Sequence, residues 1–199
     1  MFGCMEEKEV SSLQERNGIK YEVNSEVGFT GRLVEKYWDG RKKLEEHYKN
    51  GELDGLGIGW YENGQKGYEG NWKNGKKEGL WAGWWNDGQK KYVSNYKDGK
   101  KEGVWTTWYM NGQKWEEVNF KNGKEEGLST FWYEKGQKEW EGNYKNGKKE
   151  GLHTKWYKNG QKESETNYKN GKEEGLRISW HSNGQKQYEG HFKNGKVID

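Results

Sequence analysis

The sequence predicts an all-β protein, an elongated single-layer antiparallel β-meander built from 24-residue hairpin repeats. Three observations predict this fold. One glycine recurs every 24 residues along most of the chain, each interval contains paired turn dipeptides such as Asn-Gly, and the chain holds 13 Trp and 13 Tyr although hydrophobic residues are only 29% of it. Each large ring can bury about 150–250 Å², so the rings supply the interior that aliphatic residues do not.

The glycine repeat sets the domain organisation. The unit-opening glycines are Gly31, Gly55, Gly79, Gly103, Gly127, Gly151 and Gly175. Seven tandem units cover residues 31–198, and the first is degenerate because Lys36 stands where the other six have Trp. Residues 13–30 resemble a degenerate half-repeat, and residues 1–12 match no unit. We therefore expect residues 1–12 to be an unstructured N-terminal lead, since the ends of repeat arrays are atypical.

Two series of turn dipeptides divide each unit into two strands. Asn63-Gly64 represents the first series and Asn74-Gly75 the second. Asn-Gly tolerates the positive φ angles of a type I′ turn, which suits a tight hairpin. The turns are separated by 9 and 11 residues in alternation, which are strand lengths. The unit-opening glycine falls inside the longer strand, and this position predicts a β-bulge.

Alternation of side chains along a strand separates the two faces of the sheet. Leu56, Ile58 and Trp60 of a longer strand are predicted to form the packed face together with Tyr68 and Trp72 of the next strand. The opposite face carries a row of rings at Tyr61, Trp85, Tyr109, Tyr133 and Tyr157. Sequence varies most beside this row, so we predict that the row binds a partner. The alternative, that its rings only shield the second side of a one-layer sheet, stays open.

No catalytic constellation separates from the repeat. One glutamate is copied along the array amid lysines, which indicates solvated cross-strand pairing rather than the two dissimilar carboxyls of acid–base catalysis. The four histidines are scattered and lack the spacing of a metal site. We therefore predict that the protein is not an enzyme and that it uses no cofactor and no metal ion.

Composition disfavours several other classes. Lys+Arg is 35 and Asp+Glu is 32, a net charge of +3, so the balanced charge argues against a nucleic-acid partner. No run of about 18 apolar residues exists, which excludes a membrane-spanning helix. The single cysteine excludes an intramolecular disulfide and a cysteine-based zinc site.

The cysteine decides between two cellular locations. Gly3-Cys4 resembles the end of a bacterial lipoprotein cleavage motif, yet only Met1-Phe2 precede it. If Met1 is the true start, there is no signal peptide, Cys4 is a free thiol, and the protein is expected in the cytoplasm. If residues 1–12 are a trimmed lipoprotein signal, Cys4 would be lipidated and the protein anchored at the cell surface.

The repeat resembles a known family. The segment from Tyr68 to Gly79 is similar to the membrane occupation and recognition nexus (MORN) repeat, whose core reads Y-x-G-x-W-x-x-G-x-x-x-G. The segment from Trp60 to Lys66, W-Y-x-N-G-Q-K, looks like the MORN-variant repeat of bacteria. Many chains of that variant are assigned as antitoxins of toxin–antitoxin systems. The resemblance implies a β-meander scaffold for protein or lipid contact, without a catalytic residue.

These observations lead to one hypothesis and two alternatives. The leading hypothesis is a non-catalytic repeat scaffold that binds a protein partner, for which the resemblance points to a toxin. The alternatives are polysaccharide binding on a surface-anchored protein and phospholipid binding. Membrane contact would come from a lipid anchor at Cys4 or from weak attraction between lysines and anionic lipids. The sequence does not determine the identity of the partner, the compartment or the oligomeric state.

Overall fold

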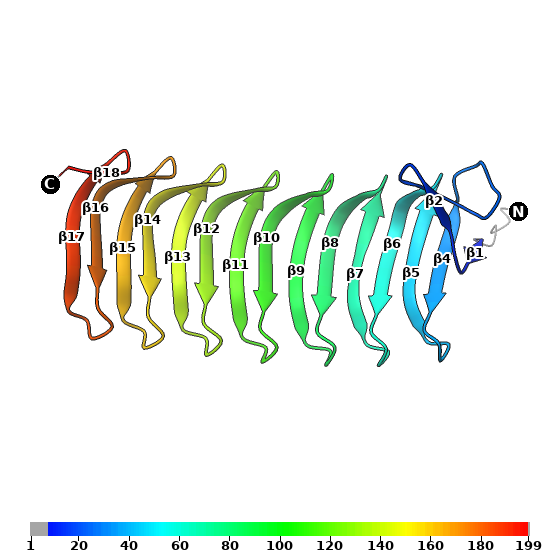
Figure 1. Ribbon diagram of the computed structural model, residues 1–199, viewed down its shortest axis with the longest axis horizontal. Helices are drawn as coiled ribbons and strands as arrows, with labels where there is room; N and C mark the ends of the chain where they lie inside the picture. The colour runs from blue at the N-terminus through cyan, green and yellow to red at the C-terminus, as the bar shows by residue number, and fades with distance from the viewer. Residues whose placement is uncertain (1–7, 199) are drawn as a thin grey trace, which may run out of the picture. The chain divides into compact units, whose positions relative to one another are not determined.

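The computed structural model describes residues 8–198, so Cys4 and most of the predicted N-terminal lead lie outside the described residues. The chain divides into two compact units, Met1–Lys100 and Lys101–Asp199, and each is described by itself. Both are all-β, as the repeat predicts, and both follow one meander pattern (Figure 1). Within residues 8–198 there is no helix with the length and apolar character needed to cross a bilayer.

The first unit contains one large sheet, which is antiparallel from β4 onward. Its strands are β1 (Glu9–Val10), β4 (Gly31–Lys36), β5 (Lys42–Lys49), β6 (Glu52–Trp60), β7 (Lys66–Lys73), β8 (Lys76–Trp84) and β9 (Lys90–Lys97), hydrogen-bonded in this order. A separate two-stranded sheet pairs β2 (Gln14–Arg16) with β3 (Ile19–Tyr21), within the predicted half-repeat. The predicted unstructured lead is wrong at Glu9–Val10, because β1 pairs in parallel with β4 and Arg32 N donates to Lys8 O at 2.7 Å.

The second unit repeats the pattern. It begins within β10 (Lys100–Trp108) and continues through β11 (Lys114–Lys121), β12 (Lys124–Trp132), β13 (Lys138–Lys145), β14 (Lys148–Trp156), β15 (Lys162–Lys169), β16 (Lys172–Trp180), β17 (Lys186–Lys193) and β18 (Lys196–Val197). Each strand pairs antiparallel with the next one along the chain. The predicted antiparallel meander of hairpin repeats is therefore confirmed.

The two turn series differ in geometry. In the second series both residues have positive φ, 51° at Asn146 and 75° at Gly147, as a type I′ turn requires. In the first series only the glycine does, with Gly112 at 81°, and Gly112 N donates to Tyr109 O at 3.0 Å. The type I′ prediction is thus confirmed for the second series and wrong for the first. There the asparagine instead accepts a hydrogen bond at its side chain, from Gln113 N to Asn111 Oδ1 at 3.0 Å.

The repeated glycine inside the longer strand marks the predicted bulge. Between β13 and β14 the register runs from Gly142 opposite His153 to Asn143 opposite Glu150. Gly151 therefore falls in the interval that has no direct partner on β13, and its φ is 73°, a conformation that costs glycine little and other residues more. The bulge prediction is confirmed.

The prediction of the packed face is wrong. Residues directly opposite each other share a face, and Ile58 lies opposite Glu69 whereas Gly59 lies opposite Tyr68. Leu56, Ile58 and Trp60 therefore occupy one face, here called the leucine face, and Tyr68, Gly70 and Trp72 occupy the other, here called the aromatic face. The cause is one extra residue on β7. Trp60 of β6 pairs with Lys66 and Gly59 with Tyr68, so Gly67 has no partner on β6. The inward–outward alternation of side chains on β7 is therefore shifted by one residue relative to that on β6.

The interior lies on the aromatic face. Near the start of the chain, Phe29, Leu33 and Tyr48 form a buried cluster, and farther along the first unit Trp81 is 2% exposed. On the leucine face, by contrast, Leu80 is 62% exposed. The leucine column that the sequence places in the core is thus largely at the surface, and the rings and small residues of the aromatic face make the packed layer.

Candidate binding face

The predicted partner-binding row lies beside the first-series turns. Its residues Tyr61, Trp85, Tyr109, Tyr133 and Tyr157 each directly follow a strand and are half-buried. Four phenol groups donate to the carbonyl of the tryptophan 23 residues on: Tyr61 to Trp84 at 2.9 Å, Tyr109 to Trp132 at 2.8 Å, Tyr133 to Trp156 at 2.7 Å and Tyr157 to Trp180 at 2.8 Å. The fifth ring, Trp85, has the Lys91 ammonium 4.3 Å from its centroid.

These hydrogen bonds give the row a structural role. Each phenol ties the end of one strand to the corresponding strand end of the next repeat, so it satisfies a carbonyl that leaves the ladder. Burial raises the pKa of Tyr109 and Tyr133, which keeps both hydroxyls protonated as donors. Tyr109 and Tyr133 also line a cavity of about 330 Å³ together with Lys135 and Lys158. The hydroxyls of the row therefore link neighbouring repeats, and in the second unit the residues Tyr109 and Tyr133 also line an accessible cavity.

A central row of directly paired residues crosses the aromatic face. In the first unit Trp81 lies opposite Gly70 on β7 and Ser94 on β9. A Cβ added to Gly70 would overlap the indole ring, so the small residue makes room for the large one. The indole packs against Trp72 with centroids 4.9 Å apart, and its Nε1 donates to Asn71 O at 3.0 Å. Large and small residues thus alternate across neighbouring strands.

The second unit fills the same row differently. Val118 lies opposite Ser129 and Gly142 opposite His153. His153 is 4% exposed, its ring would overlap a Cβ at Gly142, and it lies 4.8 Å from the centroid of Tyr168. Burial lowers the pKa of His153, against a smaller opposing effect of its hydrogen bond to Asn143 O at 2.8 Å. The neutral imidazole therefore plays the part that the indole of Trp81 plays in the first unit.

Ser129 departs from the ring pattern of this row, as Gly57 does in the first unit. It occupies the repeat position of Trp81 and His153, yet its side chain is small and 0% exposed. Within residues 8–198 its Oγ has no hydrogen-bond partner. No ring projects from this position into the space between the rings on the surrounding strands.

A cavity lies among those rings. It has a volume of about 430 Å³ and is lined by Trp115, Phe131, Glu139, Trp140, Tyr144, Lys149 and Lys155; we call it the aromatic cavity. Phe131 and Trp140 meet edge to face at 5.5 Å. Trp115 is 45% exposed and contacts Tyr109 of the predicted row at 6.1 Å. A second cavity of about 260 Å³ shares Trp140, Lys149 and Lys155 with it.

Two lysines give the aromatic cavity its charge. The Lys155 ammonium pairs with Glu163 at 2.9 Å, and this hydrogen bond raises the pKa of Lys155. The Lys149 ammonium lies 4.8 Å from the centroid of Tyr168 and 5.8 Å from that of Trp140. Within the described part of the chain no carboxylate forms an ion pair with Lys149. Lys149 is therefore a cation held against rings with hydrogen-bonding capacity to spare.

The leucine face offers a different surface. Its glutamate column pairs with lysines, but mostly along a strand, as in Lys114–Glu117 at 2.5 Å and Lys138–Glu141 at 2.5 Å. The predicted cross-strand pairing is therefore wrong for these repeats. The lysine and the glutamate are three residues apart, and the unpartnered residue next to the turn lies between them. This extra residue shifts the alternation, so the two side chains lie on one face. These exposed pairs neutralise the lysines locally and contribute little stability.

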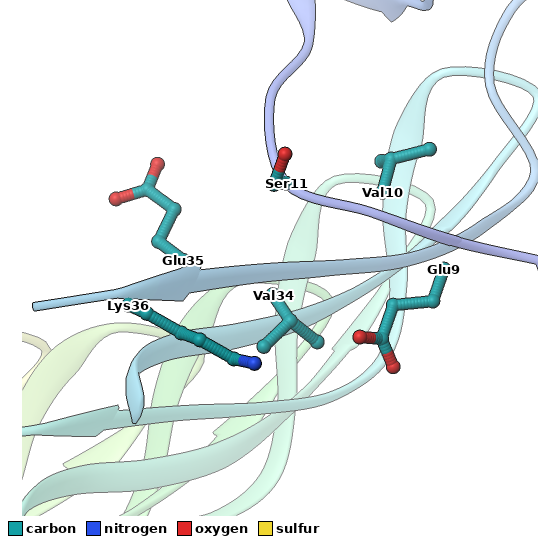
Figure 2. Close-up of a pocket in the computed structure, with 6 residues that line it drawn as sticks. All are labelled: Glu9, Val10, Ser11, Val34, Glu35 and Lys36. Atoms are coloured by element: carbon teal, nitrogen blue, oxygen red, sulfur yellow. The ribbon is translucent and has the colours of Figure 1, made fainter. Parts of the chain in front are cut away.

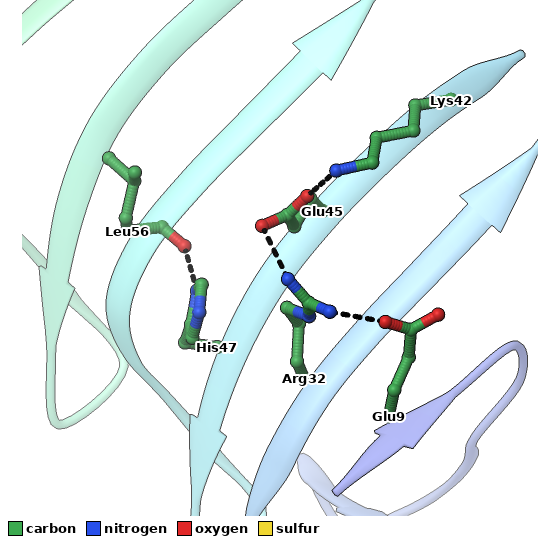
Figure 3. Close-up of polar contacts among 6 residues, drawn as sticks. All are labelled: Glu9, Arg32, Lys42, Glu45, His47 and Leu56. Atoms are coloured by element: carbon green, nitrogen blue, oxygen red, sulfur yellow. Dashed lines mark hydrogen bonds and ion pairs between the residues drawn. The ribbon is translucent and has the colours of Figure 1, made fainter. Parts of the chain in front are cut away.

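A polar cluster closes the first edge of the sheet. Arg32 bridges Glu9 on β1 and Glu45 on β5, the second at 3.4 Å (Figure 3). Lys42 also contacts Glu45, and a nearby His47 Nδ1 lies 2.7 Å from Leu56 O. Beyond the last β1 pairing lies a cavity of about 660 Å³ between β1 and the end of β4 (Figure 2). Its walls are Glu9, Val10, Ser11, Val34, Glu35 and Lys36, and they present two carboxylates and one ammonium but no ring.

The remaining candidate groups stay apart. Among residues 8–198, no group of three or more His, Cys, Asp or Glu side chains is arranged to hold a metal ion.

The aromatic cavity was not predicted from the sequence. The available signal was local: Trp115 stands where Gly67 stands in an earlier repeat, and Ser129 stands where Trp81 does.

Comparison with known proteins agrees with the repeat geometry. The family model for the MORN repeat variant matches residues 101–122, 149–170 and 173–194, which all lie in the second unit. No curated protein matches the chain. The three matched segments each span parts of the 24-residue hairpin unit that recurs through residues 31–198. The chain is thus a β-hairpin repeat protein that carries repeats of the MORN variant within residues 101–194.

Proposed function

We propose that this protein is a non-catalytic scaffold that holds a protein partner on the aromatic face of its second unit, around the aromatic cavity. The observation that carries the proposal is the cavity itself, where Trp115, Phe131 and Trp140 surround an open space on a hydrogen-bonded sheet. Tryptophan and tyrosine clusters at a concave site are typical of residues that dominate protein–protein affinity. A rigid sheet also presents them with little loss of conformational entropy on binding.

The predicted row supports the same location. Tyr109 contacts Trp115, and Tyr109 and Tyr133 line their own cavity at the turn edge. A partner seated on the aromatic cavity would therefore meet part of the predicted row as well. That the partner is a toxin, and the protein an antitoxin acting in the cytoplasm, rests on the resemblance of the repeat alone.

Two features favour this proposal over an enzyme or a lipid-binding protein. The carboxylates of the leucine face are copies of one lysine-paired column, so no pair of them differs in environment as acid–base catalysis needs. The same pairing neutralises one lysine in each of these repeats, such as Lys114 and Lys138, which weakens the attraction of the leucine face for anionic lipid headgroups. Polysaccharide binding remains an outcome of the test, because sugars also stack on exposed tryptophan rings.

The test is capture of the partner from a lysate of the source cell. We expect the chain to retain a partner that the double variant Trp115→Ala/Phe131→Ala loses. The matched control is Leu128→Ala/Leu152→Ala, which trims two exposed side chains of the leucine face and should leave recovery unchanged. Tyr109→Phe/Tyr133→Phe removes only the hydroxyls and should also retain the partner. Equal recovery with the Trp115→Ala/Phe131→Ala variant would contradict the proposal, and recovery of glycan alone would favour the polysaccharide alternative.

A further inference from the structure

We propose that the aromatic cavity binds an aryl ring that carries a carboxylate, with the ring against Phe131 and Trp140 and the carboxylate on the ammonium of Lys149. The inference deepens the proposed function, on which it rests for the source of the ligand: a partner chain ending in an aromatic residue presents this chemistry. A free aryl acid presents the same chemistry, and the experiment separates the two.

The size and lining of the cavity fit one ring. Its volume of about 430 Å³ lies at the low end of the range of about 300–1,000 Å³ for small-ligand sites. Four of its seven lining residues are aromatic. The edge-to-face contact of Phe131 with Trp140 leaves ring faces and edges directed at the cavity, and a third ring packs favourably in such an arrangement.

Lys149 is the group that selects the charge. The cavity wall carries two ammoniums, but Lys155 is already paired with Glu163. Lys149 projects from β14 into both cavities and lies 4.8 and 5.8 Å from two ring centroids. Among the described residues it interacts electrostatically with Glu125 but forms no ion pair. A carboxylate can accept hydrogen bonds from an ammonium, and such charge-assisted bonds are the stronger ones. A ligand that keeps its ring in the cavity can therefore satisfy Lys149 without displacing an existing ion pair.

The surrounding acids favour a single negative charge. Glu139 lines the aromatic cavity, and Glu125 interacts electrostatically with Lys149. Glu173 lines the neighbouring cavity but is paired there with Arg177 at 3.0 Å. The cost of removing an ion from water rises steeply with its charge, so a cavity walled largely by rings admits a carboxylate more readily than a phosphate dianion. A cationic ligand would meet Lys149 directly. The site thus matches a monoanion with an apolar ring, the chemistry of a C-terminal phenylalanine, tyrosine or tryptophan.

The chain also supplies a way to close the cavity without removing its walls. In the first unit the pair Gly70 and Trp81 fills the corresponding part of the row. The double variant Val118→Gly/Ser129→Trp installs that pair between β11 and β12, where Val118 faces Ser129. The small residue then accommodates the indole, as it does at Gly70.

The experiment is titration of the full-length protein, followed by isothermal calorimetry and by chemical shifts of the indole N–H groups. The probes are N-acetyl-phenylalanine, its carboxamide, and a hexapeptide that ends in phenylalanine with a free carboxylate. We expect N-acetyl-phenylalanine to bind with a Kd of about 1 mM. The carboxamide should bind about ten-fold more weakly, because it lacks the charge that pairs with Lys149. Lys149→Met should abolish that difference, and Val118→Gly/Ser129→Trp should abolish binding of both. The control Lys124→Met, at the exposed first residue of β12, should bind as the parent does.

The outcomes are distinguishable. Tighter binding of the hexapeptide than of N-acetyl-phenylalanine assigns the site to a chain terminus, and exclusion of the hexapeptide assigns it to a free aryl acid; both support the carboxylate–ring chemistry. Equal binding of acid and amide, no binding of either at about ten times the expected Kd, or an unchanged preference in Lys149→Met would overturn it. Partner capture that is lost in Trp115→Ala/Phe131→Ala but unaffected by Lys149→Met would leave the proposed function standing and exclude the partner's terminus as the source of the ligand.

Discussion

Replacement of Trp81 by alanine is expected to lower the free energy of unfolding by about 3–5 kcal/mol. The indole is 2% exposed and packs against three rings, those of Tyr68 at 6.0 Å, Trp72 at 4.9 Å and Tyr96 at 6.2 Å. Its loss would leave a void over Gly70, since no side chain on β7 or β9 at this level is large enough to fill it. It would also leave Asn71 O without its indole donor, which adds to the cost.

Urea unfolding followed by far-UV circular dichroism measures this effect, because the remaining tryptophans would dominate any fluorescence signal. Trp115→Ala is the matched control. The same side chain is removed there, but Trp115 is 45% exposed, and we expect a loss of about 1 kcal/mol or less. A similar, small cost for both variants would mean that the central row of the aromatic face is not the interior of the first unit.

Gly142→Val is expected to destabilise the second unit by about 3 kcal/mol, the upper end of the usual cost of overpacking. A side chain at this position overlaps the ring of His153, which is 4% exposed and is held by its bond to Asn143 O. Trp140 lies 5.1 Å and Tyr144 5.6 Å from its centroid, so the ring cannot move toward β13 to relieve the overlap.

A second substitution should relieve that strain. The double variant Gly142→Val/His153→Ser reproduces the natural pair Val118 and Ser129 of the preceding repeat. We expect the double variant to lose less unfolding free energy than the sum of the losses in the two single variants, with a coupling energy above about 1 kcal/mol. Urea unfolding of the four members of the cycle provides the value. Additive single effects would show that the paired positions do not share one packing space.

The strands and turns could be predicted because local chemistry determines them. Asn-Gly at Asn146-Gly147 adopts positive φ angles that few other residue pairs tolerate, and the bulge glycine Gly151 does the same. These positions recur every 24 residues, so the meander follows from counting. The first-series turn was mispredicted because Asn111 uses its side chain instead of its backbone conformation, a choice that the dipeptide alone does not reveal.

The faces could not be assigned from the sequence because they depend on register between strands. One unpartnered residue, Gly67, reverses which side of β7 matches which side of β6. Alternation within a strand is insensitive to that offset. For the same reason the aromatic cavity was missed: its rings Phe131 and Trp140 lie opposite each other on β12 and β13, and this pairing becomes visible only when the strands are aligned.

The central claim is that one repeat has no interior of its own and that rings and phenol hydrogen bonds between neighbouring repeats create it. The most direct test is amide hydrogen exchange of the full chain beside a peptide of residues 127–150, one complete 24-residue unit. An isolated hairpin is marginal in water, so we predict protected strand amides in the chain and none in the peptide. A peptide with the same protection as its counterpart in the chain would contradict the claim.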